Sequence, residues 1–306
     1  MALNIIFMGT PDFAVQILSK IHNSKHKILH VYTQSPKKKN RGQKTNISPV
    51  HEYCKKNQIN VRHPEELDSN QELDFFAEKK IDVVVVVAYG KILPAKLLNL
   101  KNINFLNVHA SLLPKWRGAA PIQRSIMNLD KETGVSIMKI IPKLDAGPIM
   151  IKSKVKIKKD TNSEVLSKEL SSLGAKLILD GLDLVENNKV KFIEQDETEA
   201  TYAKKIDKIE SKINWSEKAK IVIAKINAFY PKPGSWFEHK GIRLKINKAI
   251  EVSANGNPGE ILDNQLTIAC GENAIQILDL QKEGKKNMTV SEFLKGNKLE
   301  IGSNVS

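Results

Sequence analysis

The stretch "DVVVVVAYG", from Asp82 to Gly90, places five valines in a row before a Tyr-Gly turn. β-branched side chains favour an extended backbone, and the run is far shorter than the ~20 apolar residues that cross a bilayer. A second apolar run, "INFLNVH" from Ile103 to His109, follows after a short interval. Continuous apolar strands of this kind are typical of a parallel sheet that is covered on both faces. The two runs therefore predict buried strands of an α/β domain.

The N-terminal segment shows the same alternation of strands and helices. The run "LNIIFM" from Leu3 to Met8 predicts a strand, and "TPDFAVQILSKI" predicts a helix with Thr10 as N-cap and Pro11 as first helical residue. A second strand around "KILHVYT" precedes a polar loop, after which Ser48 and Pro49 repeat the same start signal. We expect an α/β fold with a doubly wound, mostly parallel, Rossmann-like sheet, whose ligands bind beyond the carboxyl ends of the strands.

The second half of the chain changes in pattern. A long helical stretch runs from Asn162 to about Asn188, and polar residues then dominate up to Glu199. After a helix around 215–229, short strand-like runs separated by Gly and Asn turns predict a small β-barrel or sandwich. We therefore divide the chain into a first domain over 1–188, a linker over 189–206 and a second domain over 207–306.

The chain is strongly basic, with 48 Lys and Arg residues against 34 Asp and Glu residues and a net charge of +14. A basic surface attracts polyanions such as nucleic acid, but a coding bias toward Lys, Ile and Asn would produce the same charge. No apolar run predicts a membrane span or a signal peptide, so we expect a cytoplasmic protein without a membrane partner. Cys54 and Cys270 stand far apart, which argues against a disulfide framework and against a cysteine zinc site.

The sequence also argues against two common kinds of cofactor site. The first turn, "MGTPDF", has Gly9 but lacks the later glycines of the G-x-G-x-x-G fingerprint, so we expect no NAD. His22, His26 and His30 span a predicted helix end, a turn and a strand, and so they cannot share one helical face as metal ligands. We therefore expect no metal.

The segment "NFLNVHASLLPKWRGAAPIQ", from Asn104 to Gln123, suggests the chemistry. Asn107 and His109 are two residues apart in a strand, so their side chains point to the same face. Asp145, in "PKLDAGP", follows another predicted strand, and neighbouring strand ends can bring its carboxylate to the imidazole. Asp145 would then orient His109, while Asn107 donates its amide hydrogens to a developing oxyanion. Because no Ser or Cys nucleophile is needed, the set favours direct transfer of an acyl group to an amine.

Several segments together resemble the folate-dependent formyltransferase family over almost the whole chain, and in particular its branch that acts on methionyl-tRNA. They are "FMGTPDFAV", "VVAYGKILP", "NVHASLLPKWRGAAPIQ", "GVSIM" followed by "LDAGP", "AFYPKPG", "PGEIL" and "LQKEGKKNM". The resemblance implies 10-formyltetrahydrofolate as donor, tetrahydrofolate as product and the α-amino group of methionyl initiator tRNA as acceptor. It also implies an OB-like C-terminal β-barrel that binds tRNA. We expect the chain to act as a monomer.

The resemblance also supports the catalytic set and implies two binding regions. The folate pocket would be lined by Tyr89, Gly90, Ile92, Leu93, Ser111, Leu112, Leu113 and Pro114. The basic loop "PKKKNRGQKTNISP" would contact tRNA through Lys37, Lys38, Lys39, Arg41 and Lys44. Two positions depart from the family pattern, since Lys115 stands where an Arg usually precedes the Trp, and Asn40 where a Gly commonly precedes the Arg.

Two other functions remain open at the level of sequence. A formyltransferase acting on a small amine, such as a glycinamide ribonucleotide or an amino-sugar nucleotide, would share the catalytic trio but would not explain the match through "AFYPKPG" and "LQKEGKKNM". A noncatalytic RNA-binding protein would use the basic loop and the barrel, and Asn107 and His109 would then only end a buried strand. Such a protein would bind RNA without any dependence on folate.

Overall fold

The computed structural model describes residues 2–39, 44–297 and 299–306, which form two compact units. The first unit comprises the chain up to Gly118, Thr133–Val155 and Ser167–Tyr202, and the second comprises Ala119–Glu132, Lys156–Leu166 and Ala203–Ser306. The domain limits expected from the sequence stay a prediction. Among the described residues, no helix combines the length and the apolar composition that a membrane crossing requires.

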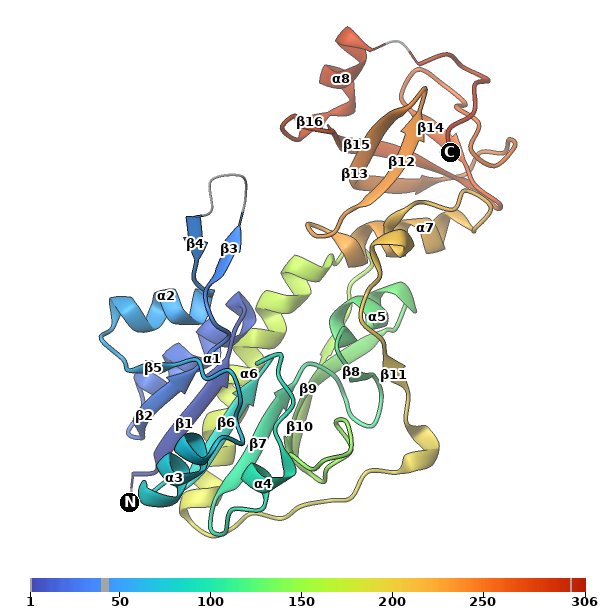
Figure 1. Ribbon diagram of the computed structural model, residues 1–306. Coiled ribbons are helices and arrows are strands. Elements are labelled where there is room, and N and C mark those ends of the chain that lie inside the picture. The colour runs from blue at the N-terminus through green and yellow to red at the C-terminus, as the bar shows by residue number, and fades with distance from the viewer. Residues whose placement is uncertain (1, 40–43, 298) are drawn as a thin grey trace. The chain divides into compact units, whose positions relative to one another are not determined.

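The first unit is built on a seven-stranded sheet in the order β10-β9-β7-β6-β1-β2-β5 (Figure 1). Its strands are β1 (Asn4–Gly9), β2 (Lys27–Tyr32), β5 (Val61–Arg62), β6 (Val83–Val87), β7 (Asn104–His109), β9 (Glu132–Lys139) and β10 (Ile149–Lys156). Pairing is parallel from β5 through to β7, whereas β9 runs antiparallel to β7. The expected doubly wound, mostly parallel sheet is therefore confirmed.

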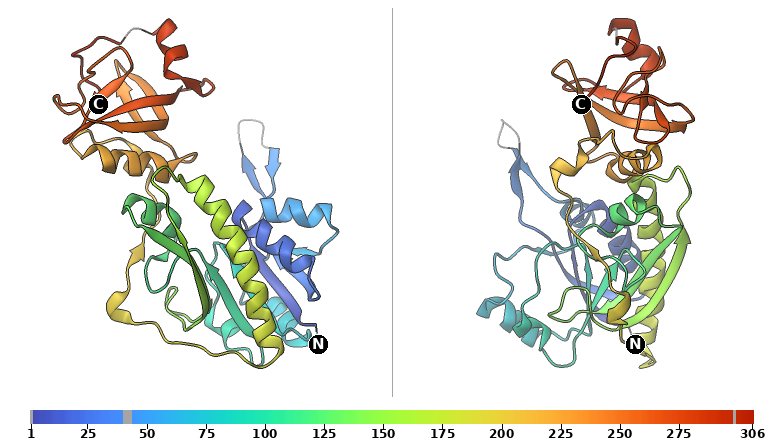
Figure 2. Two further views of the ribbon diagram at one scale, coloured as in Figure 1. Left: turned by 180° about the vertical axis from the view of Figure 1, so that it is seen from behind. Right: turned by 90° about the vertical axis from the view of Figure 1, so that its right-hand side faces the viewer.

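Helices cover both faces of this sheet. They are α1 (Asp12–His22), α2 (Pro49–Lys56), α3 (Asn70–Glu78), α4 (Ala95–Leu98) and the long α6 (Ser163–Glu186), which runs behind the sheet in Figure 1 and in front of it in the left view of Figure 2. On one face, Phe76 of α3 packs in a cluster with Val84 and Phe105. On the other face, Gly174 of α6 lies against Val108. Because strand side chains alternate, the two residues that flank Val108 point away from α6.

Of two helix starts expected from the sequence, the structure confirms one and shifts the other. Ser48 caps α2 as predicted, because its hydroxyl accepts a hydrogen bond from the His51 N–H at 3.0 Å. The prediction for α1 was wrong by one residue, since Pro11 occupies the N-cap and the helix begins at Asp12. The Thr10 hydroxyl donates instead to a backbone carbonyl in the loop after β6, at 2.8 Å. Thr10 therefore ties that loop to β1 rather than capping the helix.

The second unit contains a curled antiparallel half-barrel, as expected for an OB-like domain (Figure 2). It consists of β12 (Ser235–His239), β13 (Ile242–Val252), β14 (Thr267–Ala269), β15 (Ala274–Lys282) and β16 (Met288–Thr289), with α5 (Pro121–Met127), α7 (Ala219–Phe229) and α8 (Val290–Gly296). Its core includes Val222 and Ile226 of α7 together with Phe237. The helix expected from Trp215 starts only at Ala219, because the Asn214 side chain accepts from the Ser216 N–H in a local turn.

The remaining elements are short. β3 (Lys37–Lys39) and β4 (Lys44–Asn46) form an antiparallel pair within the basic loop, and residues 40–43, including Asn40 and Arg41, lie outside the described residues. β8 (Arg117–Gly118) and β11 (Tyr202–Ala203) form a second small pair, and η1 (Glu197–Glu199) and η2 (Lys208–Ser211) are single 3-10 turns.

Candidate active site

The three residues expected to carry the chemistry lie together in the first unit. Asn107 and His109 end β7, and Asp145 lies in the loop between β9 and β10. The Asn107 amide donates from Nδ2 to Asp145 Oδ1 at 3.3 Å, and His109 Nδ1 lies 3.6 Å from Asp145 Oδ2. The side chains of His109 and Asp145 are only 6% and 16% exposed. A carboxamide, an imidazole and a carboxylate are thus within reach of one substrate atom in a mostly buried place.

Asp145 reaches the site by a route that the sequence did not predict. Because β9 is antiparallel to β7, its last residue, Lys139, lies opposite Leu106 and not beside the carboxyl end of β7. The loop that follows β9 has to fold back along β7 before it returns into β10. Asp145 adopts a left-handed backbone conformation there, with φ of 44°, which is uncommon for a residue with a side chain. Loop geometry therefore brings the carboxylate to His109, and a parallel strand end does not.

The hydrogen-bonding groups around the trio fix its orientation. The Gly118 N–H donates to Asp145 Oδ2 at 2.9 Å, so both carboxylate oxygens have a partner. His109 Nε2 lies 2.9 Å from the Trp116 carbonyl, which can only accept, so this ring nitrogen carries a hydrogen. The Asn107 amide nitrogen carries two hydrogens, and the one not donated to Asp145 can be donated to a substrate oxygen. The free site thus presents donors where an oxyanion would develop.

The "SLLP" turn after β7 is held by two serines. The Ser111 hydroxyl donates to the Lys115 carbonyl at 2.6 Å. The Ser136 hydroxyl of β9, which is fully buried, donates to the Ser111 carbonyl at 2.8 Å and accepts from the Leu113 N–H at 3.1 Å. Leu113 is itself fully buried and packs with Met138, so its side chain belongs to the core. Only its backbone can contribute to a pocket, whereas Leu112 and Pro114 are partly exposed.

The loop after β6 forms a second part of the carboxyl edge. The Tyr89 side chain is buried, which raises the pKa of its phenol to about 12. Its carbonyl accepts from Gln34, and Gly90, with φ of 81°, lies so close to the Gln34 amide that a Cβ would overlap it. Ile92 is 92% exposed, whereas Leu93 is buried. An apolar side chain therefore projects from a firmly held loop.

Arg117, which follows the Trp of the motif, has a structural role. Its guanidinium is fully buried and donates to Gln195 Oε1 at 3.0 and 2.9 Å and to Glu197 at 3.1 and 3.0 Å. Hydrogen bonds from Arg117, followed by those from Lys143, lower the pKa of Glu197 to about 2. No local pattern in the sequence indicated Gln195, which lies in the segment expected to be a linker.

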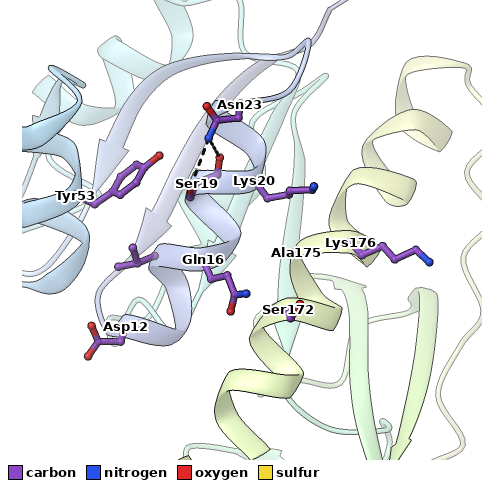
Figure 3. A pocket seen from close by; sticks show the side chains of 10 residues that line it. Asp12, Gln16, Ser19, Lys20, Asn23, Tyr53, Ser172, Ala175 and Lys176 are labelled. Carbon is purple, nitrogen blue, oxygen red and sulfur yellow. Dashed lines mark hydrogen bonds between the residues drawn. The ribbon is translucent and has the colours of Figure 1, made fainter. Parts of the chain in front are cut away.

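Two other features of the first unit lie apart from the trio. An open hollow of about 760 Å³ lies between α1 and α6, and Figure 3 shows Gln16 and Lys20 of α1 on the side that faces Ser172 of α6. None of its lining residues comes from β7 or from the loop that carries Asp145. Separately, the ligand atoms of His26, Asp183 and Glu186 lie within 4.8 Å of one another. The Lys25 ammonium already lies 2.9 Å from Asp183 and 2.5 Å from Glu186, so it supplies the positive charge there.

Family models match both halves of the chain. A model described as "Formyl transferase" matches residues 3–182, and one described as "Formyl transferase, C-terminal domain" matches residues 205–298. The chain is 46% identical to a methionyl-tRNA formyltransferase of Pelagibacter ubique over 308 aligned residues, which cover 100% of this chain and 99% of the relative. It is 40% identical to the protein of the same name from Paramagnetospirillum magneticum, over 98% of this chain and 99% of the relative.

A solved structure supports the fold. The N-formyltransferase from Helicobacter canadensis, in complex with folinic acid and dTDP-3-aminofucose, matches with a TM-score of 0.69 and 22% identity. The match covers 92% of this chain and 100% of that chain. At this identity the similarity concerns the fold and not the acceptor that is used.

Proposed function

Because this chain belongs to the methionyl-tRNA formyltransferase family, it transfers a formyl group from 10-formyltetrahydrofolate to the α-amino group of methionyl initiator tRNA, and we propose that Asn107, His109 and Asp145 carry the reaction. The single observation that supports these roles is the meeting of the three side chains, with Asn107 Nδ2 3.3 Å and His109 Nδ1 3.6 Å from the two Asp145 oxygens. The full-length similarity favours the tRNA acceptor over the small amines and over a noncatalytic RNA-binding role.

The acceptor amine needs little activation. An α-amino group has a pKa of about 7.7–8.0, so a usable neutral fraction exists near neutral pH. The C–N bond to the formyl carbon forms first, and the carbonyl oxygen becomes an oxyanion. Asn107 donates its second amide hydrogen to that oxygen, and His109 donates from Nε2 once the substrate oxygen has replaced the Trp116 carbonyl. The bond between the formyl carbon and the folate nitrogen then breaks.

A proton must move from the attacking amine to the departing folate nitrogen, so that no charge accumulates on either. Of the three kinds of side chain, an imidazole is the one that both accepts and donates a proton in general acid–base catalysis, and His109 faces the Asp145 carboxylate at 3.6 Å. Asp145 stabilises the ring when it is charged and keeps its plane fixed, as a carboxylate does beside a catalytic imidazole. No covalent intermediate with the chain is required.

The donor would bind along the carboxyl edge of the sheet. Leu112 and Pro114 would contact it beside the trio, together with the backbone of Ser111 and Leu113, whose side chains are fully buried. From the loop after β6, the backbone of Tyr89, Gly90 and Leu93 would line the pocket, and the exposed Ile92 side chain would cover an apolar part of the folate. Backbone groups fixed by hydrogen bonds and one exposed apolar side chain suit a folate, which has both polar and apolar parts.

The acceptor tRNA would be bound by two basic regions. Lys37, Lys38, Lys39 and Lys44 flank the tip of the β3–β4 loop, and Arg41 lies outside the described residues. These side chains would attract the phosphate backbone, and the C-terminal half-barrel would extend the contact. We further propose a monomeric enzyme that acts in the cytoplasm, where its tRNA substrate is used. Sedimentation of the purified chain at increasing concentration tests the first of these statements.

The test is a comparison of acceptors. Purified protein receives 10-formyltetrahydrofolate with methionyl-tRNA, a glycinamide ribonucleotide or an amino-sugar nucleotide, and the release of tetrahydrofolate is followed. We expect release only with methionyl-tRNA. His109→Ala and Asp145→Asn should each abolish most of the transfer while the temperature of thermal unfolding stays close to that of the wild type. Full activity of either variant would remove that residue from the mechanism.

A further inference from the structure

A segment between α6 and β11 is hydrogen-bonded at both ends to other parts of the first unit. We call residues 193–201 the crossing segment; it belongs to the yellow stretch of Figure 1. At one end, Ile193 exchanges two backbone hydrogen bonds with Ile149 of β10, at 2.8 and 2.9 Å. At the other end, the Thr201 carbonyl accepts from the Arg117 N–H, and its hydroxyl accepts from the Trp116 N–H, both at 2.9 Å. The crossing segment is therefore held at both ends by hydrogen bonds and is not a free connection.

Gln195 is the residue of the crossing segment that reaches the loop between β9 and β10, residues 140–148, which carries Asp145 and is called the catalytic loop below. Its Nε2 donates to the carbonyl of Asp145 at 2.9 Å and to that of Gly147 at 2.7 Å. Its Oε1 accepts two hydrogen bonds from Arg117. A guanidinium can only donate, so the amide oxygen must face Arg117, and the NH2 group must then face the two carbonyls. The fully buried Arg117 thus fixes which way the amide of Gln195 points.

The catalytic loop is closely packed at Gly147. A Cβ on Gly147 would overlap the carbonyl of Lys139, so the loop is packed directly against β9 on one side. On the other side it is held by Gln195. Between these two supports, Asp145 keeps its left-handed backbone, and its carboxylate meets both Asn107 and the Gly118 N–H. A shift of the Asp145 backbone would therefore displace the carboxylate from its two partners.

We propose that Gln195 is a positioning residue for formyl transfer, which acts by holding the Asp145 backbone while Arg117 orients its amide. The proposal rests on the catalytic role proposed above for Asp145. Gln195 would not touch the substrates. Its contribution lies in placing a carboxylate to within a fraction of an ångström, and a misplacement of about 1 Å costs about 10²-fold in rate.

Gln195→Glu tests the hydrogen bonds that hold the Asp145 backbone while it leaves the packing of the side chain unchanged. Glutamate keeps the size and shape of glutamine and keeps an acceptor for Arg117, but it replaces both N–H donors with an oxygen that faces two carbonyls. We expect kcat to fall by about 10²-fold, with the KM for donor and for tRNA unchanged. The matched control is Asp196→Asn, an isosteric change at the next position, where the side chain is exposed and accepts hydrogen bonds from Thr198. Its kcat should equal that of the wild type.

A double-mutant cycle tests whether Gln195 acts through Asp145. In an Asp145→Asn background, measured in single turnovers with excess enzyme, Gln195→Glu should cause no further loss, because the group that it positions is already gone. Gln195→Ala serves as a second variant if Gln195→Glu unfolds. An unchanged kcat for both variants, a raised KM in place of a lowered kcat, or losses that multiply in the cycle would each overturn the proposal. Failure of the proposed function looks different, since Asp145→Asn alone would then be fully active.

Discussion

The carboxamide of Asn107 offers a sharp test of the proposed chemistry. One amide hydrogen is donated to Asp145 over 3.3 Å, so the other can serve a substrate oxygen. Asn107→Ala removes this donor, and the loss of one oxyanion donor costs about 10²- to 10³-fold in turnover, or about 2.7–4 kcal/mol. Asp145 keeps the hydrogen bond from the Gly118 N–H at 2.9 Å, so we expect the catalytic loop to stay in place.

Asn107→Asp should be worse than Asn107→Ala, and its defect should depend on pH. It keeps the shape of the side chain but places a second carboxylate at the position now 3.3 Å from Asp145 Oδ1. Two ionised carboxylates at that distance repel by about 5 kcal/mol at an effective dielectric constant of about 20. Such a pair retains one proton up to a higher pH than an isolated carboxyl does, and the protonated form is again a donor. Relative to the wild type, its activity should therefore rise as the pH falls.

The assay is acid-quenched single turnover of labelled formyl transfer to methionyl-tRNA, with each variant compared with the wild type at the same pH. Asn104→Ala, at the start of the same strand, is the matched control and should leave turnover unchanged. Near-native turnover of Asn107→Ala would refute the oxyanion assignment. Equal activities of Asn107→Ala and Asn107→Asp at every pH would refute the proximity of Asp145.

Arg41→Ala should cripple formylation of methionyl-tRNA without weakening folate binding, whereas Lys38→Ala should only lower tRNA affinity and reduce the salt dependence by about one phosphate contact. Equal turnover and equal salt slopes for the two variants would leave Arg41 without a special role. Burial raises the pKa of the Cys54 thiol to about 12, so an alkylating reagent should modify it only after unfolding; mass spectrometry of the native protein checks this, and modification without unfolding would contradict it. Hydrogen bonds from Arg117 lower the pKa of Glu197 from its ordinary 4.5 to about 2, so this pair stabilises the fold above that ordinary value, and the stabilisation is lost as the pH falls toward 2. The difference in unfolding temperature between the wild type and Glu197→Gln should shrink over that range, and a difference independent of pH would refute the pairing.

The sheet and part of the site follow from local patterns. A short run of β-branched residues such as Val83–Val87 favours a buried strand, and the long helix from Ser163 to Glu186 carries a periodic apolar stripe. The shared face of Asn107 and His109 needs only the two-residue period of a strand. These features depend on neighbours in the sequence, so a single chain without relatives is enough to predict them.

Other parts of the site depend on contacts between distant positions. Gln195 lies 50 residues from Asp145 and 78 from Arg117 in the sequence. The residues next to it in the sequence are mostly polar and show no hydrophobic periodicity, as is typical of a linker. The place of Asp145 depends on an antiparallel strand and a returning loop, and the sequence pattern does not distinguish these from a parallel strand end. The motif "SLLP" led us to expect Leu113 in the folate pocket, but its side chain packs against Met138 in the core.

The crossing segment also matters for recombining modules between enzymes. The two family models end at 182 and begin at 205, so a designer who joins one protein's first module to another's second would cut anywhere in the interval. A cut before Ile193 would supply the residue at position 195 from a foreign chain, beside a buried arginine that it had not been selected to meet. A cut after Thr201 would keep the native partner of Arg117, together with both anchors. Hybrids joined at the later point should retain turnover, whereas hybrids joined at the earlier point should bind both substrates and transfer the formyl group slowly.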